Sequence, residues 1–456
     1  MNMGSQVIKE DEKKHFYKVV FMLVIPLALQ NLINVGVSAA DVVMLGKVGE
    51  ISLSASSLAG QIQFIMVLFI FGITSGAAVL TAQYWGKRDI ATIEKVLAIS
   101  MGISIAIGAL FTIGVQLFPE QIMRIYTNDE KVIEEGILYL RIISLSYIVV
   151  SITMVYLNIM RSVERVLIST LVYLISLITN VILNAILIFG LLGFEPMGIK
   201  GAAIATLIAR IVELVIVLFY GRFMNKEISF RIKYFFSWDK LLAKDFFTYA
   251  IPVMINELLW GAGTSTIVAI VGHLGTAVVA ANSVTQVIRQ LATVVSFGVS
   301  GATAIIVGKA IGEGKIEEAK VYSKRLIKMT LVFGAAGAVL ILALSGVITN
   351  FMTLSQEATS YLRFMMFVMS YFVIAQAYNT TLIVGVFRGG GDTKYGLILD
   401  AITLWGCSIF FGALAAFVFE LPIPIVYIIL LSDEIIKLPF TAKRHKSLKW
   451  INDVTR

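Results

Sequence analysis

Residues 54–80 read SASSLAGQIQFIMVLFIFGITSGAAVL, a stretch of apolar and small residues without one charged side chain. About 20 such residues are enough for a helix to cross the hydrocarbon core of a membrane. The rest of the chain has the same character, because 58% of its 456 residues are hydrophobic and only 14% are charged. A soluble domain carries about 25% charged residues. This composition excludes a soluble enzyme, a disordered chain and a nucleic-acid binder, and it predicts a polytopic membrane protein.

Twelve stretches are long and apolar enough to be membrane-spanning helices, so we predict an all-α protein with twelve transmembrane helices. Asp433 and Glu434 interrupt the last stretch. The predicted spans lie near 18–45, 54–80, 96–118, 136–158, 166–191, 198–221, 247–272, 277–305, 326–349, 361–386, 395–419 and 421–440.

The lysines and arginines are distributed unevenly between the loops. An even number of spans places both chain ends on the same side, and the segments on that side hold 29 of the 37 lysines and arginines. The opposite loops hold six. Because cytoplasmic loops carry the excess of positive charge, both termini are predicted to be cytoplasmic, in a multi-pass protein of the cell membrane. The same bias explains the net charge of +8 without a nucleic-acid partner.

The two halves of the chain repeat each other at an offset of 226 residues. At this offset Gly46 meets Gly272 and Phe71 meets Phe297, and the register holds over some 40 residues. Each copy has six spans, so the copies have the same orientation in the membrane and form a parallel internal repeat. Two such lobes are typical of transporters that open a cleft to either side in turn. The alternative interpretation is an old duplication without mechanistic meaning.

The repeat and the charged segments together predict the domain organisation. The basic segment between the lobes interleaves aromatic with cationic residues, which is typical of a helix lying on the anionic inner leaflet. The predicted parts are a cytoplasmic tail at 1–15, an N-terminal six-helix lobe at 16–221, a basic cytoplasmic linker at 222–244, a C-terminal six-helix lobe at 245–441 and a basic cytoplasmic tail at 442–456.

Polar side chains at membrane depth are costly, and they are therefore functional candidates. Asp41 lies in the first span, Asn180 and Asn184 lie on one face of the fifth, and Thr206 lies in the sixth. One carboxylate with several neutral oxygens can hold a hard monovalent cation such as Na⁺, and the carboxylate can instead carry a proton. The alternative is an aspartate that two asparagines bind as structural glue.

Three further residues within spans are candidates. Glu257 lies in the middle of the seventh span, and Arg289 either faces the cleft or pairs with Glu257. Pro26 interrupts the hydrogen-bond ladder of the first span, so a hinge there would let ion binding at Asp41 change the shape of the helix. A proline kink without function is the alternative. A single cysteine and three histidines argue against a disulfide or a cysteine- or histidine-rich metal site.

The other charges within spans have simpler explanations. Arg210 and Glu213 are three residues apart on one helix and are expected to pair. Asp400, near the cytoplasmic end of its span, either snorkels or pairs with Lys394. Lys437 follows Asp433 and Glu434 by about one turn and is expected to pair with one of them at the membrane edge.

Several motifs follow one another in an order similar to that of the multidrug and toxic compound extrusion (MATE) family, and the resemblance covers nearly the whole chain. They include Pro26, DVVMLGKVG at 41–49, AQYWGKRD at 82–89, NVILNAILIFG at 180–190, GIKGAAIAT at 198–206, VGHLGTAVVAANSV at 271–284 and FRGGGDT at 387–393.

The resemblance implies a two-lobe antiporter, driven by Na⁺ or H⁺, that exports organic and often cationic amphipathic compounds. Glu257 matches an acid used by one branch of the family, but its partner acid is missing from the stretch around Gln376. The cation site that the resemblance implies consists of Asp41, Asn180, Asn184, Ala202 and Thr206.

Other functions fit the sequence less well. A flippase or exporter for a lipid-linked or peptide substrate would favour a strongly cationic cleft, for which only Arg210 and Arg289 are available. A membrane-embedded enzyme would need clustered catalytic side chains at one depth, which we do not find. A symmetric channel does not suit two lobes with different acids. The expected partners are therefore small organic substrates and membrane lipids, with no cofactor other than the coupling ion, for a protein that functions as a monomer.

Overall fold

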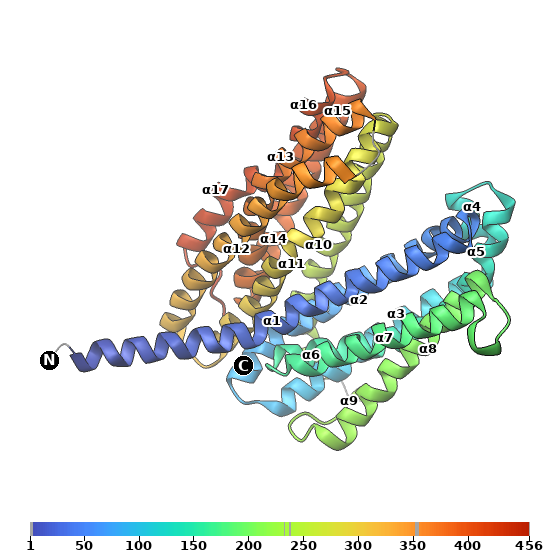
Figure 1. The fold of residues 1–456 in the computed structure, drawn as a ribbon. Coiled ribbons are helices and arrows are strands. Elements are labelled where there is room, and N and C mark those ends of the chain that lie inside the picture. Colours follow the sequence, from blue (N-terminus) through green and yellow to red (C-terminus); the bar gives the residue numbers. More distant parts are fainter. Residues whose placement is uncertain (1–2, 232, 237–238, 352–354, 456) are drawn as a thin grey trace. The chain divides into compact units, whose positions relative to one another are not determined.

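The computed structural model describes residues 3–231, 233–236, 239–351 and 355–455, so parts of the predicted tails and linker lie outside it. All regular elements of this part of the chain are helices (Figure 1), which confirms the all-α class. Helices suit a chain this apolar, because within lipid they satisfy their own backbone polar groups. The elements are α1 (Met3–Val48), α2 (Glu50–Gly86), α3 (Ile90–Leu117), α4 (Pro119–Tyr126), α5 (Glu130–Ile143), α6 (Ser146–Ser162), α7 (Val166–Phe189), η1 (Leu191–Gly193), α8 (Gly198–Phe219), η2 (Tyr220–Met224), α9 (Lys233–Phe236), α10 (Lys240–Gly272), α11 (Thr276–Gly312), α12 (Ile316–Phe351), α13 (Gln356–Thr380), η3 (Thr381–Phe387), α14 (Thr393–Asp400), η4 (Ala401–Ile409), α15 (Phe410–Phe417), α16 (Ile423–Leu430) and α17 (Asp433–Lys446).

Within the described residues, ten helices are long and apolar enough to cross a membrane, and the bent pair of α5 and α6 provides an eleventh span. The predicted span at 421–440 differs from the others. It is divided into α16 and α17 at Leu431 and Ser432. The buried charged residues Asp433 and Glu434 therefore lie in the first turn of a new helix and not in the middle of an apolar one. The twelve-helix fold is consistent with this count.

The internal repeat is visible in the helix boundaries. Helix α11 begins and ends 226 residues after α2, and α12 begins 226 residues after α3. Gly49 precedes α2 with φ of 154°, and Gly275 precedes α11 with φ of 116°. Residues with a Cβ rarely adopt such φ values, so both copies need glycine at this turn. The predicted repeat and its register are confirmed.

Packing divides the chain into two compact units, Leu32–Leu258 and Met1–Asn31 together with Leu259–Arg456. Both divisions fall inside a helix, one in α1 and the other in α10. The N-terminal part of each of these helices therefore packs with the other half of the sequence. The lobes at 16–221 and 245–441 are defined by the repeat rather than by packing, and their boundaries stay a prediction.

Glycines allow two helices of the Leu32–Leu258 unit to approach closely. A Cβ added to Gly72 would overlap the backbone of Met254, and one added to Gly76 would overlap the backbone of Ala250. Both pairs join α2 to the N-terminal part of α10. Small residues at such contacts are a general means of helix packing in membranes, where lipid tails give apolar side chains no reason to associate.

We expect Gly76→Leu to destabilise this unit by about 3 kcal/mol, at the upper end for overpacking, since the added side chain must displace a backbone rather than a flexible side chain. The yield of monodisperse protein after size-exclusion chromatography and the unfolding temperature measure the effect. Gly60→Leu is the matched control, because this glycine lies on the same helix with no atom within 4 Å of an added Cβ. Equal unfolding temperatures for the two variants would contradict the packing described.

The last described residues are a folded part of the other unit. Trp450 is fully buried, and its indole N–H donates to the carbonyl of His445 at 3.1 Å. The backbone N–H of Asn452 donates to the carbonyl of Gly390 at 2.9 Å. A Cβ at Gly390 would overlap the Trp450 carbonyl. The glycines of the FRGGGDT motif thus make room for the C-terminal segment.

The His445 imidazole gives this segment a pH dependence. It stacks on Trp450 with ring centroids 5.8 Å apart, and burial, reinforced by Lys324, lowers the pKa of His445 from 6.5 to about 4. The unfolded chain therefore binds more protons between these pH values, so this contribution to stability is lost as the pH falls from 6.5 to 4. We expect Trp450 fluorescence to report loosening over this interval in the wild type, and a weaker pH dependence in His445→Gln. An identical pH profile for both proteins would contradict this.

Candidate cation-coupling site

Three helices of the Leu32–Leu258 unit supply the predicted cation site. Asp41 lies on α1, Asn180 and Asn184 on α7, and Thr206 on α8. Helices α7 and α8 run side by side (Figure 1), joined by a short connection through η1. Asn180 and Asn184 are four residues apart and share one face of α7, because residues at this spacing are neighbours on a helix surface.

The four polar side chains form one continuous hydrogen-bonded chain. The amide nitrogen of Asn184 donates to Asp41 Oδ1 at 2.6 Å and to Asn180 Oδ1 at 3.1 Å. The amide nitrogen of Asn180 in turn donates to Thr206 Oγ1 at 3.1 Å. The side chains that the sequence places at similar depth therefore do meet in the structure.

These four hydrogen-bonded side chains are largely buried, and the side-chain oxygen of Asn184 has no partner among them. Asn184 is fully buried and Asn180 is 2% exposed, whereas Asp41 is half-buried. The side-chain oxygen of Asn184 is buried and has no hydrogen-bond partner. A buried amide oxygen without a partner costs about 1–3 kcal/mol.

The nearest charges leave the Asp41 carboxylate without a direct ion pair among the described residues. Arg210 interacts with Asp41 electrostatically, but its guanidinium lies 2.6 Å from Glu213, which is 1% exposed. The predicted pair of Arg210 and Glu213 is confirmed. Tyr139, on α5, is a further electrostatic neighbour of Asp41. Its place beside Asp41 depends on the tertiary fold, and no sequence motif marks it.

The donor set suits a monovalent cation or a proton better than a divalent metal. Within the described part of the chain, no three His, Cys, Asp or Glu side chains lie where they could hold a metal ion. The Asp41 carboxylate, the unpaired Asn184 oxygen and the Thr206 hydroxyl are one charged and two neutral oxygens. Such a set fits Na⁺, which accepts neutral oxygen ligands, and the carboxylate alone can bind a proton.

The other predicted site residues lie elsewhere or have other partners. Ala202 is buried one turn before Thr206 and contributes space rather than a ligand. Pro26 lies within the continuous helix α1, in the part that belongs to the other unit. Arg289 also belongs to that unit. The Arg289 guanidinium donates to Gln286 at 2.7 Å and to Gln376 at 3.4 Å. Glu257 belongs to the Leu32–Leu258 unit.

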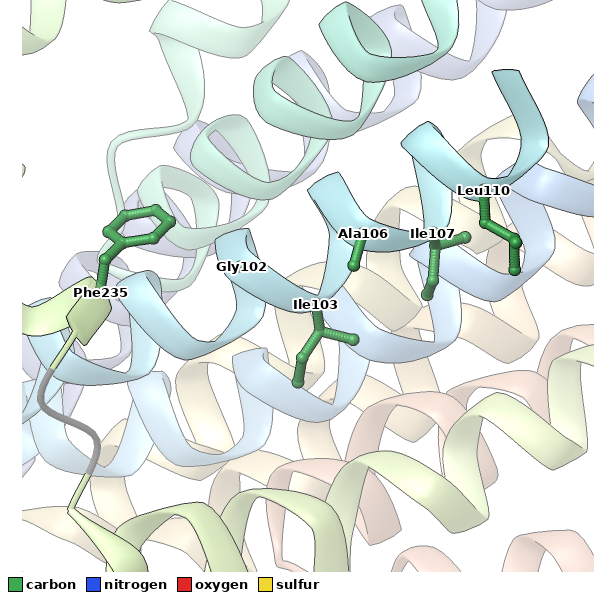
Figure 2. Close-up of a pocket in the computed structure, with 6 residues that line it drawn as sticks. All are labelled: Gly102, Ile103, Ala106, Ile107, Leu110 and Phe235. Atoms are coloured by element: carbon green, nitrogen blue, oxygen red, sulfur yellow. The ribbon is translucent and has the colours of Figure 1, made fainter. Parts of the chain in front are cut away.

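A groove of 380 Å³ on α3 is unrelated to this site. Figure 2 shows that apolar residues of α3 line it from one side and Phe235 of α9 from the other. The segment before α9 is fastened to α3 because Arg231 pairs with the buried Glu94 at 2.9 Å. In the predicted linker at 222–244, the described residues form the end of η2, the four-residue α9 and the first residues of α10. The lining of the groove has no charged group that could bind a coupling ion.

The profile of the MatE family matches residues 26–186 and 252–414, which together make up most of the chain. The chain belongs to the MatE family. It is therefore a multi-pass membrane transporter rather than an enzyme. The two matched segments follow the internal repeat, one in each half of the sequence.

Relatives and solved structures of this family share low identity with the chain over nearly its full length. It is 21% identical over 406 residues to the probable multidrug resistance protein YoeA of Bacillus subtilis, covering 88% of both chains. It is 22% identical to the probable multidrug resistance protein NorM of Agrobacterium fabrum, covering 85% of this chain and 84% of that protein. A crystal structure of MATE in the bent conformation superposes with a TM-score of 0.85 at 19% identity, covering 95% of this chain and 96% of that one. An outward-facing MATE family transporter gives a TM-score of 0.83 at 21% identity, with the same coverage.

Proposed function

We propose that this MatE protein is an antiporter that exports organic, often cationic amphipathic compounds in exchange for Na⁺ or H⁺. The observation that carries the proposal is the buried chain from Asp41 through Asn184 and Asn180 to Thr206. The relatives named multidrug resistance proteins support the substrate class. In this proposal both termini lie in the cytoplasm, and the lobes at 16–221 and 245–441 open a cleft to either side of the membrane in turn.

The amide of Asn184 is the element that senses the ion. Its N–H groups now point at Asp41 and at Asn180. A cation bound at Asp41 repels these N–H groups, and a proton on Asp41 supplies a donor that needs an acceptor. In either case the amide gains by turning its unpaired oxygen toward Asp41. Asn180 Oδ1 then loses its donor, and it regains one if the Asn180 amide also turns and accepts from the Thr206 hydroxyl. Ion binding would thus reverse the hydrogen bonds between α7 and α8.

Coupling follows if the rearranged site and the bound substrate exclude each other. One positive charge entering the cell gains about 2.3 kcal/mol per 100 mV, and a tenfold ion gradient adds about 1.4 kcal/mol. The sum of about 3.7 kcal/mol supports an outward gradient of several hundred-fold for a neutral substrate. For a monovalent cationic substrate exchanged one for one, the voltage contribution cancels and only the ion gradient drives export.

Transport in proteoliposomes tests this function. We expect the purified protein to move a fluorescent cationic dye when an inward-directed Na⁺ or pH gradient is imposed, and to stop when that gradient is dissipated. Separate Na⁺ and pH gradients identify the ion. Dye movement that is independent of both gradients would contradict antiport.

We expect Asn184→Ala to weaken the apparent affinity for the coupling ion by roughly 10- to 100-fold, because one hydrogen bond or ligand to a charged group contributes about 1.5–3 kcal/mol. The ion concentration that gives half-maximal dye efflux measures this shift. Ser176→Ala, one turn beyond Asn180 on the same helix, is the control and should leave the affinity unchanged. An unaltered ion dependence in Asn184→Ala would remove this amide from the site.

A further inference from the structure

A second buried charge cluster lies in the unit that contains the C-terminal half. The Lys437 ammonium is 2.9 Å from Asp400, 2.8 Å from Asp433 and 3.5 Å from Glu434. All four side chains are nearly buried, with side-chain exposures between 3% and 11%. The expectation that Asp400 snorkels or pairs with Lys394 is wrong, because Asp400 lies on the buried Lys437. The expected pairing of Lys437 with Asp433 or Glu434 is confirmed, and all three side chains are buried in the protein.

The cluster lies where three helices lose their regularity. Asp400 is the last residue of α14, directly before the π-helix η4. Asn379, near the end of α13, precedes the π-helix η3, and Asp433 begins α17 after the break that follows α16. π-Helices in proteins frequently mark functional sites, and broken helices in transporters form ion sites.

One carboxylate oxygen in the cluster is poorly satisfied. Asp400 Oδ1 is buried and lies 2.9 Å from the Lys437 ammonium, an ion pair without good hydrogen-bond geometry. The other polar groups are well bound: the Asn379 amide donates to Glu434 Oε2 at 2.7 Å and accepts from Thr441 Oγ1 at 2.9 Å. The cluster therefore has a tightly held frame around the Lys437 ammonium, whose contact with Asp400 is the less well aligned one.

The charges of the cluster do not balance. Three ionised carboxylates against one ammonium would leave a net charge of −2 in the interior. The other charged neighbour is Arg289 on α11, which interacts with Glu434 electrostatically but has no carboxylate in direct contact among the described residues. Even with Arg289 counted, one negative charge remains. Carboxylates that share a buried site cannot all ionise near neutral pH, because like charges repel strongly at low dielectric constant.

We propose that the cluster of Asp400, Asp433, Glu434 and Lys437 is a proton-binding site, with one exchangeable proton held mainly on Glu434. Glu434 is the residue farthest from the ammonium, at 3.5 Å, and so gains least from it when ionised. The Asn379 amide that donates to its Oε2 at 2.7 Å is neutral and stabilises an ionised carboxylate less than a second cation in direct contact would. The role of this proton in transport rests on the proposed function, in which it would be a coupling ion additional to the one at Asp41. Proton binding itself does not depend on that function.

Infrared difference spectroscopy of the purified protein in lipid tests the proposal, because a protonated carboxylic acid has a C=O band separate from that of a carboxylate. We expect a carboxylic acid band at neutral pH that is lost in Glu434→Gln and retained in Asp392→Asn. Asp392 is the matched control, since this buried carboxylate has its own base, Arg444, at 2.7 Å. A wild-type spectrum without such a band, or a band unchanged in Glu434→Gln, would overturn the proposal.

Asp41→Asn separates this site from the first one. A band that Asp41→Asn removes and Glu434→Gln leaves intact belongs to Asp41 and would overturn the proton site at the cluster, while supporting H⁺ at the first. A band retained in Asp41→Asn supports the cluster whatever the outcome of the transport assay. Should Glu434→Gln not fold, Asp433→Asn keeps Glu434 and removes one repelling charge, so the band should disappear at a pH lower by about one unit or more. An unshifted titration in Asp433→Asn would count against the cluster.

Discussion

Replacing Asp41 with asparagine should abolish cation-driven export while the protein still reaches the membrane and folds. Among the four hydrogen-bonded side chains of the site, only Asp41 has a carboxylate, and the substitution removes it. The asparagine keeps an oxygen that can accept a hydrogen bond from Asn184 at the present 2.6 Å. Without a charge, the site binds neither Na⁺ nor H⁺ with useful affinity. Gradient-driven dye efflux in proteoliposomes should fall to the level of protein-free vesicles.

Control variants separate loss of coupling from loss of fold. Glu195→Gln removes a carboxylate from an exposed loop and should transport as the wild type does. The unfolding temperature of Asp41→Asn should match that of the wild type, because its hydrogen bond is preserved. Efflux by Asp41→Asn at the wild-type rate under the same gradient would refute Asp41 as the coupling residue.

Lys437→Met should destabilise the protein by about 3–5 kcal/mol, because removing one partner of a buried ion pair leaves uncompensated charge in the interior. Here a single ammonium serves three carboxylates. Thermal unfolding in detergent measures the loss. Adding Asp433→Asn to Lys437→Met removes one stranded ionised acid and should restore part of the stability.

The comparison lysine for this prediction is Lys315, whose exposed ion pair with Glu313 at 2.8 Å is screened by water. Lys315→Met should leave the unfolding temperature almost unchanged. If Lys437→Met unfolds at the same temperature as Lys315→Met, the buried cluster does not contribute as the structure indicates.

Local sequence patterns predicted the helices and the repeat well, because both depend on features that the chain carries locally. The spans follow from runs of apolar residues, and Gly49 and Gly275 mark equivalent turns in both halves. The sequence also predicted that the polar side chains from Asp41 to Thr206 meet in one site. In lipid a polar side chain needs a partner, and the sequence offers few polar residues within these spans.

The features that the sequence did not reveal depend on distant residues or on irregular backbone. Asp400 has its partner 37 residues away in Lys437, although Lys394 is much closer along the chain. The burial of Trp450 depends on the glycines of the FRGGGDT motif. Hydropathy alone predicts a weakly apolar span at 421–440, whereas the structure has a break before α17 and buried charged side chains directly after it. In each case tertiary packing decides, and a periodic pattern carries no information about it.

The release of coupling ions on substrate binding tests the exchange at Asp41 most directly. In weakly buffered solution, adding a cationic dye to the purified wild-type protein should release H⁺ or, in Na⁺-loaded protein, Na⁺. The released amount should fall by about one ion per protein in Asp41→Asn. In Glu434→Gln, the ion bound at Asp41 should still be released. The contradicting result is that dye binds the wild type and the amount of ion released is the same in Asp41→Asn. The ion and the substrate would then not compete through this carboxylate.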